Sequence, residues 1–263
     1  MNDQHRESVL LRETRDGITM LTLNRPRQRN ALSMSLMEEL IEALESIAGD
    51  ADVKVVVIRG NGPAFCAGHD LKEMRADPRE EAHRNTFAAC AKLMTTIVEL
   101  PQPVIGRVHG IATAAGCQLV ATCDLAIAAD DARFATPGVN IGLFCSTPMV
   151  ALSRNVGRKQ AMEMLLTGEM IDAATAERFG LINQFVPLAE LDTAVQELAE
   201  KIRSKSPLVL KIGKEAFYRQ LECGIREAYE YTGAVMVRNM MTDDAAEGID
   251  AFIEKRRPVW TGS

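Results

Sequence analysis

Apolar and polar residues alternate near the start of the chain, and apolar residues run together in several later segments. The segments V-L-L-R-E-T-R at 9–15 and G-I-T-M-L-T-L at 17–23 predict two strands, which the tripeptide N-R-P at 24–26 ends. Three mostly continuous apolar runs predict strands that are covered on both faces, at 53–58, 104–108 and 125–128. The first half of the chain is therefore expected to alternate strands and helices.

Apolar residues spaced three and four apart indicate the helices. Ser33 can cap a helix from Met34 to about Ala48. One face of that helix would be apolar, with Leu36, Met37, Leu40, Ile41 and Leu44. From about Met149 onward the pattern is nearly all helical, and Pro187 and Pro207 mark helix starts.

Composition and charge narrow the class of protein. The 263 residues are 47% apolar and 25% charged, which is typical of a soluble globular protein with a substantial core. The net charge of −6 argues against nucleic acid as a partner. No uninterrupted apolar run approaches the roughly 20 residues of a membrane span, so we expect no membrane partner. The first ten residues carry charges of both signs and no apolar core, so they are not expected to be a signal peptide.

The cysteines show no pattern of disulfides or metal ligands. The 6 cysteines include no C-x-x-C pair. Cys117 and Cys123 are poorly spaced for one helix face, so no metal site is expected. Free thiols indicate a reducing compartment, and we expect a cytoplasmic location.

Two segments of the chain predict the same order of structural features. V-V-V-I-R-G-N-G-P-A-F-C-A-G-H-D-L-K-E-M at 55–74 and P-V-I-G-R-V-H-G-I-A-T-A-A-G-C-Q-L-V at 103–120 each contain a strand, a glycine turn, a short extended piece, a small-residue corner and a helix. The corners are 67–69 and 114–116, and each would expose backbone N–H groups at a helix start. Small residues also allow tight packing, but two such corners indicate a pair of donors that converge on one oxygen.

Four motifs then identify a family. F-C-A-G-H-D-L-K-E-M, A-T-A-A-G-C-Q-L-V-A-T-C-D-L-A-I-A, F-A-T-P-G-V-N-I-G-L and A-F-I-E-K-R-R-P-V-W resemble the enoyl-CoA hydratase/isomerase (crotonase) superfamily, in the right order and essentially end to end. The second and third motifs look closest to the branch called enoyl-CoA hydratase domain-containing protein 3. The segments at 68–70 and 139–140 are also similar to the methylmalonyl-CoA decarboxylase branch.

The resemblance implies an α/β fold in which repeated ββα units wind into a spiral. Residues 1–200 would form this crotonase-like core with the acyl-CoA pocket, and 201–263 a C-terminal helical segment that makes trimers. The expected assembly is a homotrimer or homohexamer. No cofactor is expected besides coenzyme A, whose thioester is the substrate or ligand.

The same resemblance assigns the catalytic positions. The backbone N–H groups of His69 and Ala115 would form the oxyanion hole that holds the thioester oxygen as it becomes an enolate. The two hydratase glutamates match Gln118 and Gly138, so both acids are missing here. Because each acid–base group is worth about 10²–10⁴ in rate, ordinary hydration is expected to be weak or absent. A catalytic role for the His69 side chain stays open.

Further residues are expected to bind the substrate by their position in the family motifs. Around the corners these are Ala67, Asp70, Leu71 and Lys72, together with His69 and Ala115. In the acyl pocket they are Asn140, Phe144 and Cys145, and Cys145 is a nucleophile only if its pKa is lowered. Along the CoA chain they are Arg25, Arg29 and Ala31, and Phe252 and Lys255 would reach the adenine and 3′-phosphate in a neighbouring subunit.

Two classes of function stay open. The first is an acyl-CoA enzyme that uses the oxyanion hole without the glutamate pair, with decarboxylation of a malonyl-type thioester as the leading case. The second is a non-catalytic acyl-CoA binder or regulatory subunit. Gln118 and Gly138 favour the second class, whereas the small-residue corner at Ala115 favours the first.

Overall fold

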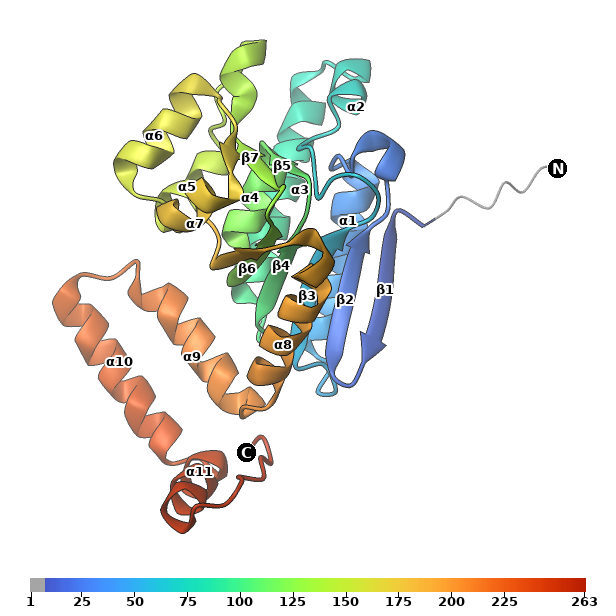
Figure 1. Cartoon of the computed structure of the whole chain (residues 1–263). Coiled ribbons are helices and arrows are strands. Elements are labelled where there is room, and N and C mark those ends of the chain that lie inside the picture. The colour runs from blue at the N-terminus through green and yellow to red at the C-terminus, as the bar shows by residue number, and fades with distance from the viewer. Residues whose placement is uncertain (1–7) are drawn as a thin grey trace.

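The computed structural model describes residues 8–263 (Figure 1). The expectation about a signal peptide falls mainly on residues 1–7, which lie outside the described part of the chain. A sheet in the order β1-β2-β3-β4-β6-β9 forms the centre of the molecule. A smaller sheet in the order β5-β7-β8 lies beside the ends of its strands. Only the β1–β2 and β7–β8 pairings are antiparallel in these two sheets.

The strands follow the apolar runs closely. Those of the large sheet are β1 (Leu10–Arg15), β2 (Ile18–Leu23), β3 (Val55–Gly60), β4 (Val104–Val108), β6 (Leu125–Ala129) and β9 (Gln184–Val186), and those of the small sheet are β5 (Ile111–Thr113), β7 (Arg133–Ala135) and β8 (Ile171–Asp172). The strand expected at 53–58 begins later, because Val53 N–H donates to Asp50 O in the preceding turn. The other expected strands of the first half are confirmed to within a residue or two.

The helices that cover the core are α1 (Met34–Ala48), α2 (Leu71–Ala76), α3 (Glu80–Glu99), α4 (Ala115–Thr122), α5 (Pro148–Asn155), α6 (Arg158–Thr167), α7 (Ala173–Phe179) and α8 (Leu191–Arg203). The bounds of α1 and its cap are confirmed, since the Ser33 side chain accepts from Leu36 N–H. Short 3-10 helices are η1 (Pro26–Gln28), η2 (Pro137–Ile141) and η3 (Leu188–Glu190). Pro187 therefore precedes a 3-10 turn and not an α-helix, and β8 and β9 interrupt the helical second half.

The large sheet is buried on both faces by alternate residues of its strands. In β3, Val56 and Ile58 join the core cluster that contains buried residues of α1, α3 and α4. Val55 and Val57 join a second cluster, which α8 covers with Leu191, Val195 and Ala199. Because side chains alternate along a strand, a continuous apolar run is what a sheet covered on both faces requires.

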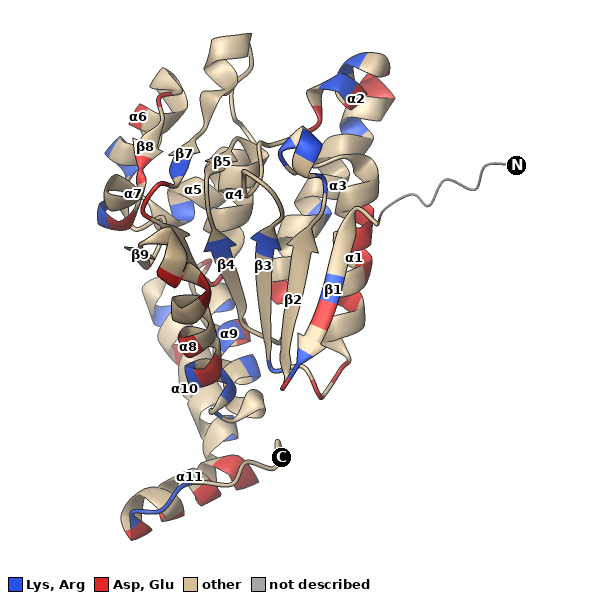
Figure 2. Cartoon of the chain, turned by 45° about the vertical axis from the view of Figure 1, so that its right-hand side comes forward, with Lys and Arg blue, Asp and Glu red and all other residues tan. Residues whose placement is uncertain are grey.

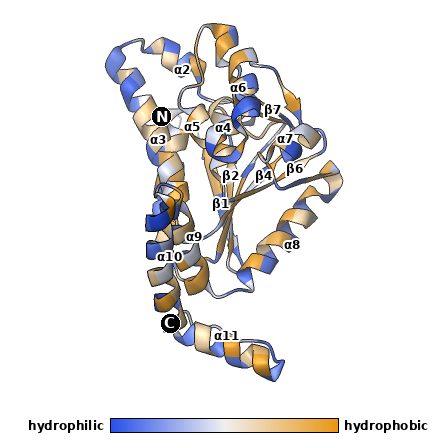
Figure 3. Cartoon of the chain, turned by 90° about the vertical axis from the view of Figure 1, so that its left-hand side faces the viewer, coloured by the Kyte–Doolittle hydropathy of each residue, from blue (hydrophilic) through white to orange (hydrophobic). Residues whose placement is uncertain are grey.

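The last helices, α9 (Pro207–Gln220), α10 (Ile225–Met240) and α11 (Asp243–Glu254), extend away from the sheet (Figure 1, Figure 3). The buried Lys214 ammonium anchors α9 to the core, because it lies 2.7 Å from Asp124 Oδ2 and donates to the carbonyls of Ile97 and Gln102. Many apolar side chains of α10 and α11 are exposed, including Ile225, Met236, Val237, Met240, Phe252 and Ile253. Within residues 8–263, no helix has the length and apolar character needed to cross a membrane.

Candidate active site

The two small-residue corners lie side by side because their extended segments pair in parallel. Cys66 and Ala112 form a parallel bridge, with Cys66 N–H donating to Ile111 O at 3.0 Å and Thr113 N–H donating to Cys66 O at 3.0 Å. Both segments reach their corners after the same number of residues, so His69 comes level with Ala115. The geometry at the corners supports the expected convergence of the two backbone donors.

Two glycines allow this close approach. A Cβ on Gly68 would lie 2.9 Å from the Ala114 Cβ and 3.4 Å from Ala115 N. A Cβ on Gly116 would lie 2.1 Å from Cys66 O, which leaves no room for any side chain. Gly68 also has a φ of +94°, a backbone conformation that L residues rarely adopt.

Ala114 forms the turn that leads into α4. Its φ of 51° and ψ of −119° are unusual for a residue with a Cβ, and such a conformation costs of order 1–3 kcal/mol. The turn directs the following N–H groups outward at the start of α4, where the helix has no acceptor for them. Neither the His69 N–H nor the Ala115 N–H donates to any acceptor among residues 8–263. Two adjacent, unpaired backbone donors are the requirement for an oxyanion hole.

Loop 29–32 fixes the first corner. Ala67 N–H donates to Arg29 O, Leu32 N–H to Gly68 O and Asp70 N–H to Leu32 O, at 2.8–3.1 Å. These bonds form a parallel bridge between Leu32 and His69 and leave the His69 N–H unpaired. Arg29 and Ala31, which the sequence suggested for substrate binding, therefore also support the corner through their backbone.

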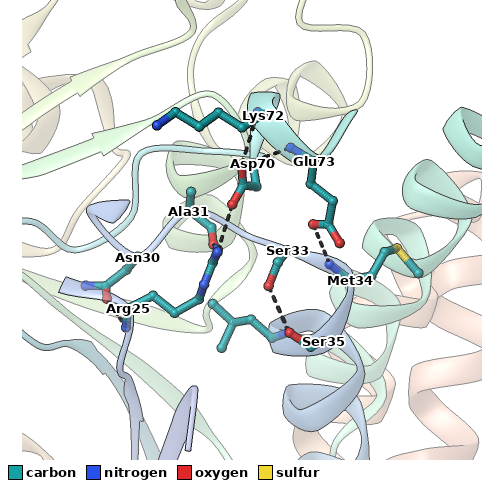
Figure 4. A network of polar contacts seen from close by, with 10 residues as sticks. Arg25, Asn30, Ala31, Ser33, Met34, Ser35, Asp70, Lys72 and Glu73 are labelled. Carbon is teal, nitrogen blue, oxygen red and sulfur yellow. Dashed lines mark hydrogen bonds and ion pairs between the residues drawn. The ribbon is translucent and has the colours of Figure 1, made fainter. Parts of the chain in front are cut away.

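Arg25 and Asp70 form an ion pair behind this corner (Figure 4). The Arg25 guanidinium lies 2.8 Å from Asp70 Oδ2 and also donates to Ala31 O, and the two charged side chains are only 16% and 13% exposed. Asp70 Oδ1 accepts from the N–H groups of Lys72 and Glu73 at the start of α2. The guanidinium and the carboxylate are thus engaged within the protein, so these side chains position the corner.

Asn30 is a structural residue that sequence reasoning missed. It is fully buried with a φ of 54°, and its amide donates to Asn61 O at 2.9 Å and Ala64 O at 2.7 Å. Its Oδ1 accepts from Arg25 N–H. Asparagine tolerates the left-handed conformation better than other residues with a Cβ, so its place in N-R-P-R-Q-R-N-A-L was the available signal.

The His69 side chain turns into the protein. Its ring meets the Phe87 ring of α3 edge to face at a centroid distance of 5.6 Å. Both ring nitrogens are buried and have no hydrogen-bond partner among the described residues. Burial lowers the pKa of His69 from its ordinary value of 6.5, so the imidazole is neutral near neutral pH.

Gln118 lies on α4, a helix whose 8 residues are all buried. It is 5% exposed, and its Oε1 lies 3.8 Å from the Cys90 thiol. An amide can hold a water molecule but cannot take a proton near neutral pH. The side chain therefore cannot act as a general base.

Gly138 lies in η2, close to the second corner. Ala114 N–H donates to Ala135 O, and η2 begins two residues after Ala135. A Cβ on Gly138 would lie 2.9 Å from both Cys145 Sγ and Leu143 O. The space that the Cβ of a glutamate at position 138 would need is thus occupied by the segment that follows η2.

The pocket residues of this segment differ in exposure. Phe144 is 42% exposed, and its neighbours Ile141 and Leu143 are more exposed still. Cys145 is buried, its Sγ accepts from Gly138 N–H at 3.3 Å, and burial raises the pKa of its thiol. The condition for a nucleophilic Cys145, a lowered pKa, is therefore not met. The Asn140 amide donates to Gly168 O at 3.4 Å, which ties η2 to the end of α6.

The remaining predicted residues fall into two groups. Leu71 and Lys72 are exposed at the start of α2 beside the first corner, and Ala67 belongs to that corner. Phe252 and Lys255 lie on and just after α11, at the opposite end of the molecule from α2 and α4 (Figure 1, Figure 3). They do not reach the corners of their own chain.

Known proteins of one family resemble this chain over nearly its whole length. Residues 13–263 match the family model described as enoyl-CoA hydratase/isomerase. A relative from Xenopus laevis, "Enoyl-CoA hydratase domain-containing protein 3, mitochondrial", is 48% identical over 260 residues, which cover 99% of this chain and 88% of the relative. Its name is that of the branch which the motifs indicated.

Solved structures agree with this relationship. A crystal structure titled as an enoyl-CoA hydratase from Mycobacterium smegmatis has a TM-score of 0.95 and 53% identity, covering 97% of this chain and 99% of that one. The human enoyl-CoA hydratase domain-containing protein 3 has a TM-score of 0.93 and 47% identity, covering 96% and 100%. The expected crotonase-like α/β fold is confirmed.

The comparison overturns one prediction. We expected a cytoplasmic location from the free cysteines, but relatives from Xenopus laevis, mouse and human that are 48% identical are all named as mitochondrial proteins. The expectation was wrong because free thiols indicate only a reducing environment, and more than one compartment provides it.

Proposed function

The chain belongs to the enoyl-CoA hydratase/isomerase family, and from this premise we propose that it binds an acyl-CoA thioester and stabilises negative charge on the thioester oxygen. The observation that carries the proposal is the pair of N–H groups at His69 and Ala115, which have no acceptor in the described part of the chain and are held level by the Cys66–Ala112 bridge. Removal of one such donor typically costs roughly 3–4 kcal/mol of transition-state stabilisation.

We propose further that ordinary hydration of a double bond is weak or absent. Addition of water needs a base to activate the water and an acid to protonate the adjacent carbon. Gln118 offers an amide and Gly138 offers no side chain, while the neutral His69 ring is packed against Phe87. The site therefore suits a reaction that forms an enolate without a strong protein base.

Decarboxylation of a malonyl-type thioester is such a reaction. The bond between Cα and the carboxylate carbon breaks, CO₂ leaves, and the electron pair moves to the thioester oxygen. The two N–H groups would stabilise this enolate, and a proton from water then adds to Cα. The protein needs to supply only binding, orientation and the oxyanion hole.

A non-catalytic acyl-CoA binder is the second candidate. The lack of a carboxylic acid at both Gln118 and Gly138 favours it, because acyl-CoA binding and oxyanion contacts do not require either acid. The two candidates predict the same affinity for a thioester but differ in turnover.

Incubation with a panel of acyl-CoA thioesters followed by mass spectrometry tests both. Loss of CO₂ from a malonyl-type thioester supports the enzyme, and calorimetric binding without any product supports the binder. Crotonyl-CoA hydration at rates usual for a hydratase would overturn our account of Gln118 and Gly138. No binding of any thioester would overturn the proposal itself.

We also propose that the chain assembles into a trimer or hexamer. Phe252 is 85% exposed and Ile253 69% exposed on α11, and Ile225 of α10 is 80% exposed. Since burial of such side chains is worth roughly 1.5–3 kcal/mol each, a second copy is the natural cover for them. Phe252 and Lys255 would then meet the CoA of a neighbour. Light scattering tests this, and a monomer at micromolar concentration would contradict it.

A further inference from the structure

The face of the large sheet that α8 covers carries two arginines on neighbouring strands. Arg59 of β3 pairs in register with Arg107 of β4, so their side chains leave the sheet side by side on the face that α8 covers. Figure 2 shows basic residues at the carboxyl ends of both strands. Neighbouring strands lie only about 4.8 Å apart, and like charges directly opposite one another are destabilising.

Arg107 has protein partners for its charge. Its Nε lies 2.8 Å from Asp192 Oδ1 and its second terminal nitrogen 3.2 Å from Asp192 Oδ2. Another terminal N–H donates to His109 Nδ1, at 3.0 Å. Since a guanidinium only donates, His109 must accept there and donate from Nε2 to Gly62 O, at 2.7 Å. Arg107 is therefore fixed, and it is only 11% exposed.

Arg59 makes no ion pair of its own among residues 8–263, although Asp192, whose pKa is lowered first by its hydrogen bonds with Arg107, also feels the charge of Arg59. Its Nε donates to Thr22 Oγ1 at 2.9 Å, and no carboxylate of residues 8–263 lies within ion-pair distance of its guanidinium. The N–H groups of both terminal nitrogens have no acceptor in this part of the chain. An arginine that is half-buried next to a second arginine, with no carboxylate within ion-pair distance of its own guanidinium, presents a site for an anion.

These groups line a hollow of about 430 Å³. Leu11, Thr22, Arg59 and Arg107 form a row across four strands, and Asn61, Gly62, His109 and Leu188 complete the walls. The hollow is large enough for a phosphate group. Three of its polar side chains, those of Thr22, Asn61 and His109, are already held by hydrogen bonds within the protein.

We propose that this hollow binds a phosphate group through the terminal N–H groups of Arg59, next to the ion pair of Arg107 and Asp192. A phosphate suits the hollow because its several oxygens can accept from a planar guanidinium in pairs. The binding site is separate from the two backbone corners, which lie at the small-residue turns after Cys66 and Ala112. The proposal does not depend on turnover of an acyl-CoA.

The test is calorimetry of the full chain with inorganic phosphate at low ionic strength. We expect one site per chain, and Arg59→Gln should weaken phosphate binding at least about tenfold. Arg158→Gln is the matched control, because Arg158 is exposed and makes no ion pair with any of residues 8–263. Equal binding by wild type and Arg59→Gln, or an equal loss in Arg158→Gln, would overturn the proposal.

A second variant, which is expected to strengthen phosphate binding, tests the proposal even if Arg59→Gln does not fold. Asp192→Asn removes the carboxylate beside Arg107, so it should tighten phosphate binding about threefold or more. Glu197→Gln, an exposed change on the same helix, should leave the affinity within about twofold. Unchanged or weaker binding in Asp192→Asn would contradict the proposal even if Arg59→Gln did not fold.

Two further measurements distinguish this hollow from the acyl-CoA site and phosphate from a smaller anion. With one equivalent of acetyl-CoA present, phosphate should still bind, whereas its complete displacement would mean that phosphate occupies the acyl-CoA site. Acetate should bind at least about tenfold more weakly than phosphate, since it carries fewer acceptors and less charge. If Arg59→Gln changed the assembly in light scattering but not the phosphate affinity, the arginine pair would be a contact between copies and the proposal would be wrong.

Discussion

Gly68 lies so close to Ala114 that a methyl group on Gly68 would come within 2.9 Å of the Ala114 Cβ. Both residues have positive φ, +94° for Gly68 and 51° for Ala114. Each immediately precedes a residue whose N–H has no acceptor among residues 8–263, His69 in one case and Ala115 in the other. The contact between these two small residues therefore sets how far apart the two donors lie.

The first prediction concerns this contact. Gly68→Ala should lower stability by roughly 1–3 kcal/mol, because it adds both the clash and the cost of an unfavourable φ. It should also weaken acyl-CoA binding, since the donors must separate. Thermal unfolding and calorimetry with acetyl-CoA measure the two effects. Gly213→Ala is the control, because a Cβ there meets nothing within 4 Å, and that change in α9 should be neutral or stabilising.

The second prediction concerns the ion pair behind the first corner. Asp70→Asn should lower stability by roughly 1.5–3 kcal/mol, because Arg25 loses its charged partner in a largely buried place. Asparagine still caps a helix, so the start of α2 should persist. Chemical denaturation measures the loss. Asp77→Asn, on an exposed carboxylate at the end of the same helix, should cost much less.

The third prediction is a pH dependence from His69. Burial holds its pKa in the folded chain below the ordinary 6.5, which it regains on unfolding. Between these two values the unfolded chain binds a proton that the folded chain does not bind. The stabilising effect is therefore complete above pH 6.5 and is lost as the pH falls through the folded pKa.

Urea denaturation at several pH values between 8 and 5 measures this effect. The loss of stability on acidification should be smaller in His69→Gln than in the wild type. An identical slope in His69→Gln and the wild type would show that the buried ring does not govern the pH response.

The fourth prediction concerns thiol reactivity. Burial raises the pKa of Cys66, Cys90, Cys117 and Cys123 to about 12, and it also raises the pKa of Cys145. Cys223 is the partly exposed cysteine of the six. A thiol reagent should therefore label one site per folded chain quickly, and Cys223→Ser should abolish this fast phase. Fast labelling of Cys145 in Cys223→Ser would restore the nucleophile hypothesis.

The sequence predicted the elements and the corners because their signals are local. The apolar run of β3 and the Ser33 cap of α1 depend on a few adjacent residues, and the repeated plan of 55–74 and 103–120 revealed both corners. The resemblance added the order of the motifs and the missing acids. These parts of the site needed no long-range contact to be recognised.

The parts that escaped prediction are contacts between distant segments. The Arg25–Asp70 pair joins residues 45 apart, and the register that places Arg59 beside Arg107 joins two strands with α2 and α3 between them in the chain. The direction of the His69 ring depends on Phe87 of α3. The residue types alone gave no indication of these contacts, since an arginine on a strand can pair with many different residues.

The last prediction tests whether missing acids are the main obstacle to hydration. Gln118→Glu is nearly isosteric and should fold, although burial will raise the pKa of the new carboxyl. Gly138→Glu is harder for a steric reason, because its Cβ would lie 2.9 Å from Cys145 Sγ and Leu143 O. Its φ is not positive, so backbone conformation is no barrier. Cys145→Ala should therefore be added to remove the contact with sulfur, and the backbone at Leu143 must still shift to accept the new Cβ.

The triple variant Gln118→Glu, Gly138→Glu, Cys145→Ala should hydrate crotonyl-CoA measurably. The two carboxyl groups act as a unit, so either one alone should give little gain. The matched control carries Gly138→Gln with the other two changes, because it has the same shape but lacks the second acid. Absorbance of the thioester-conjugated double bond measures the rate, and thermal unfolding shows which variants fold. If the folded triple variant binds acetyl-CoA but is no faster than its control, the pocket around Phe144 must exclude the crotonyl group or the water, and the missing acids alone do not explain the absence of hydration.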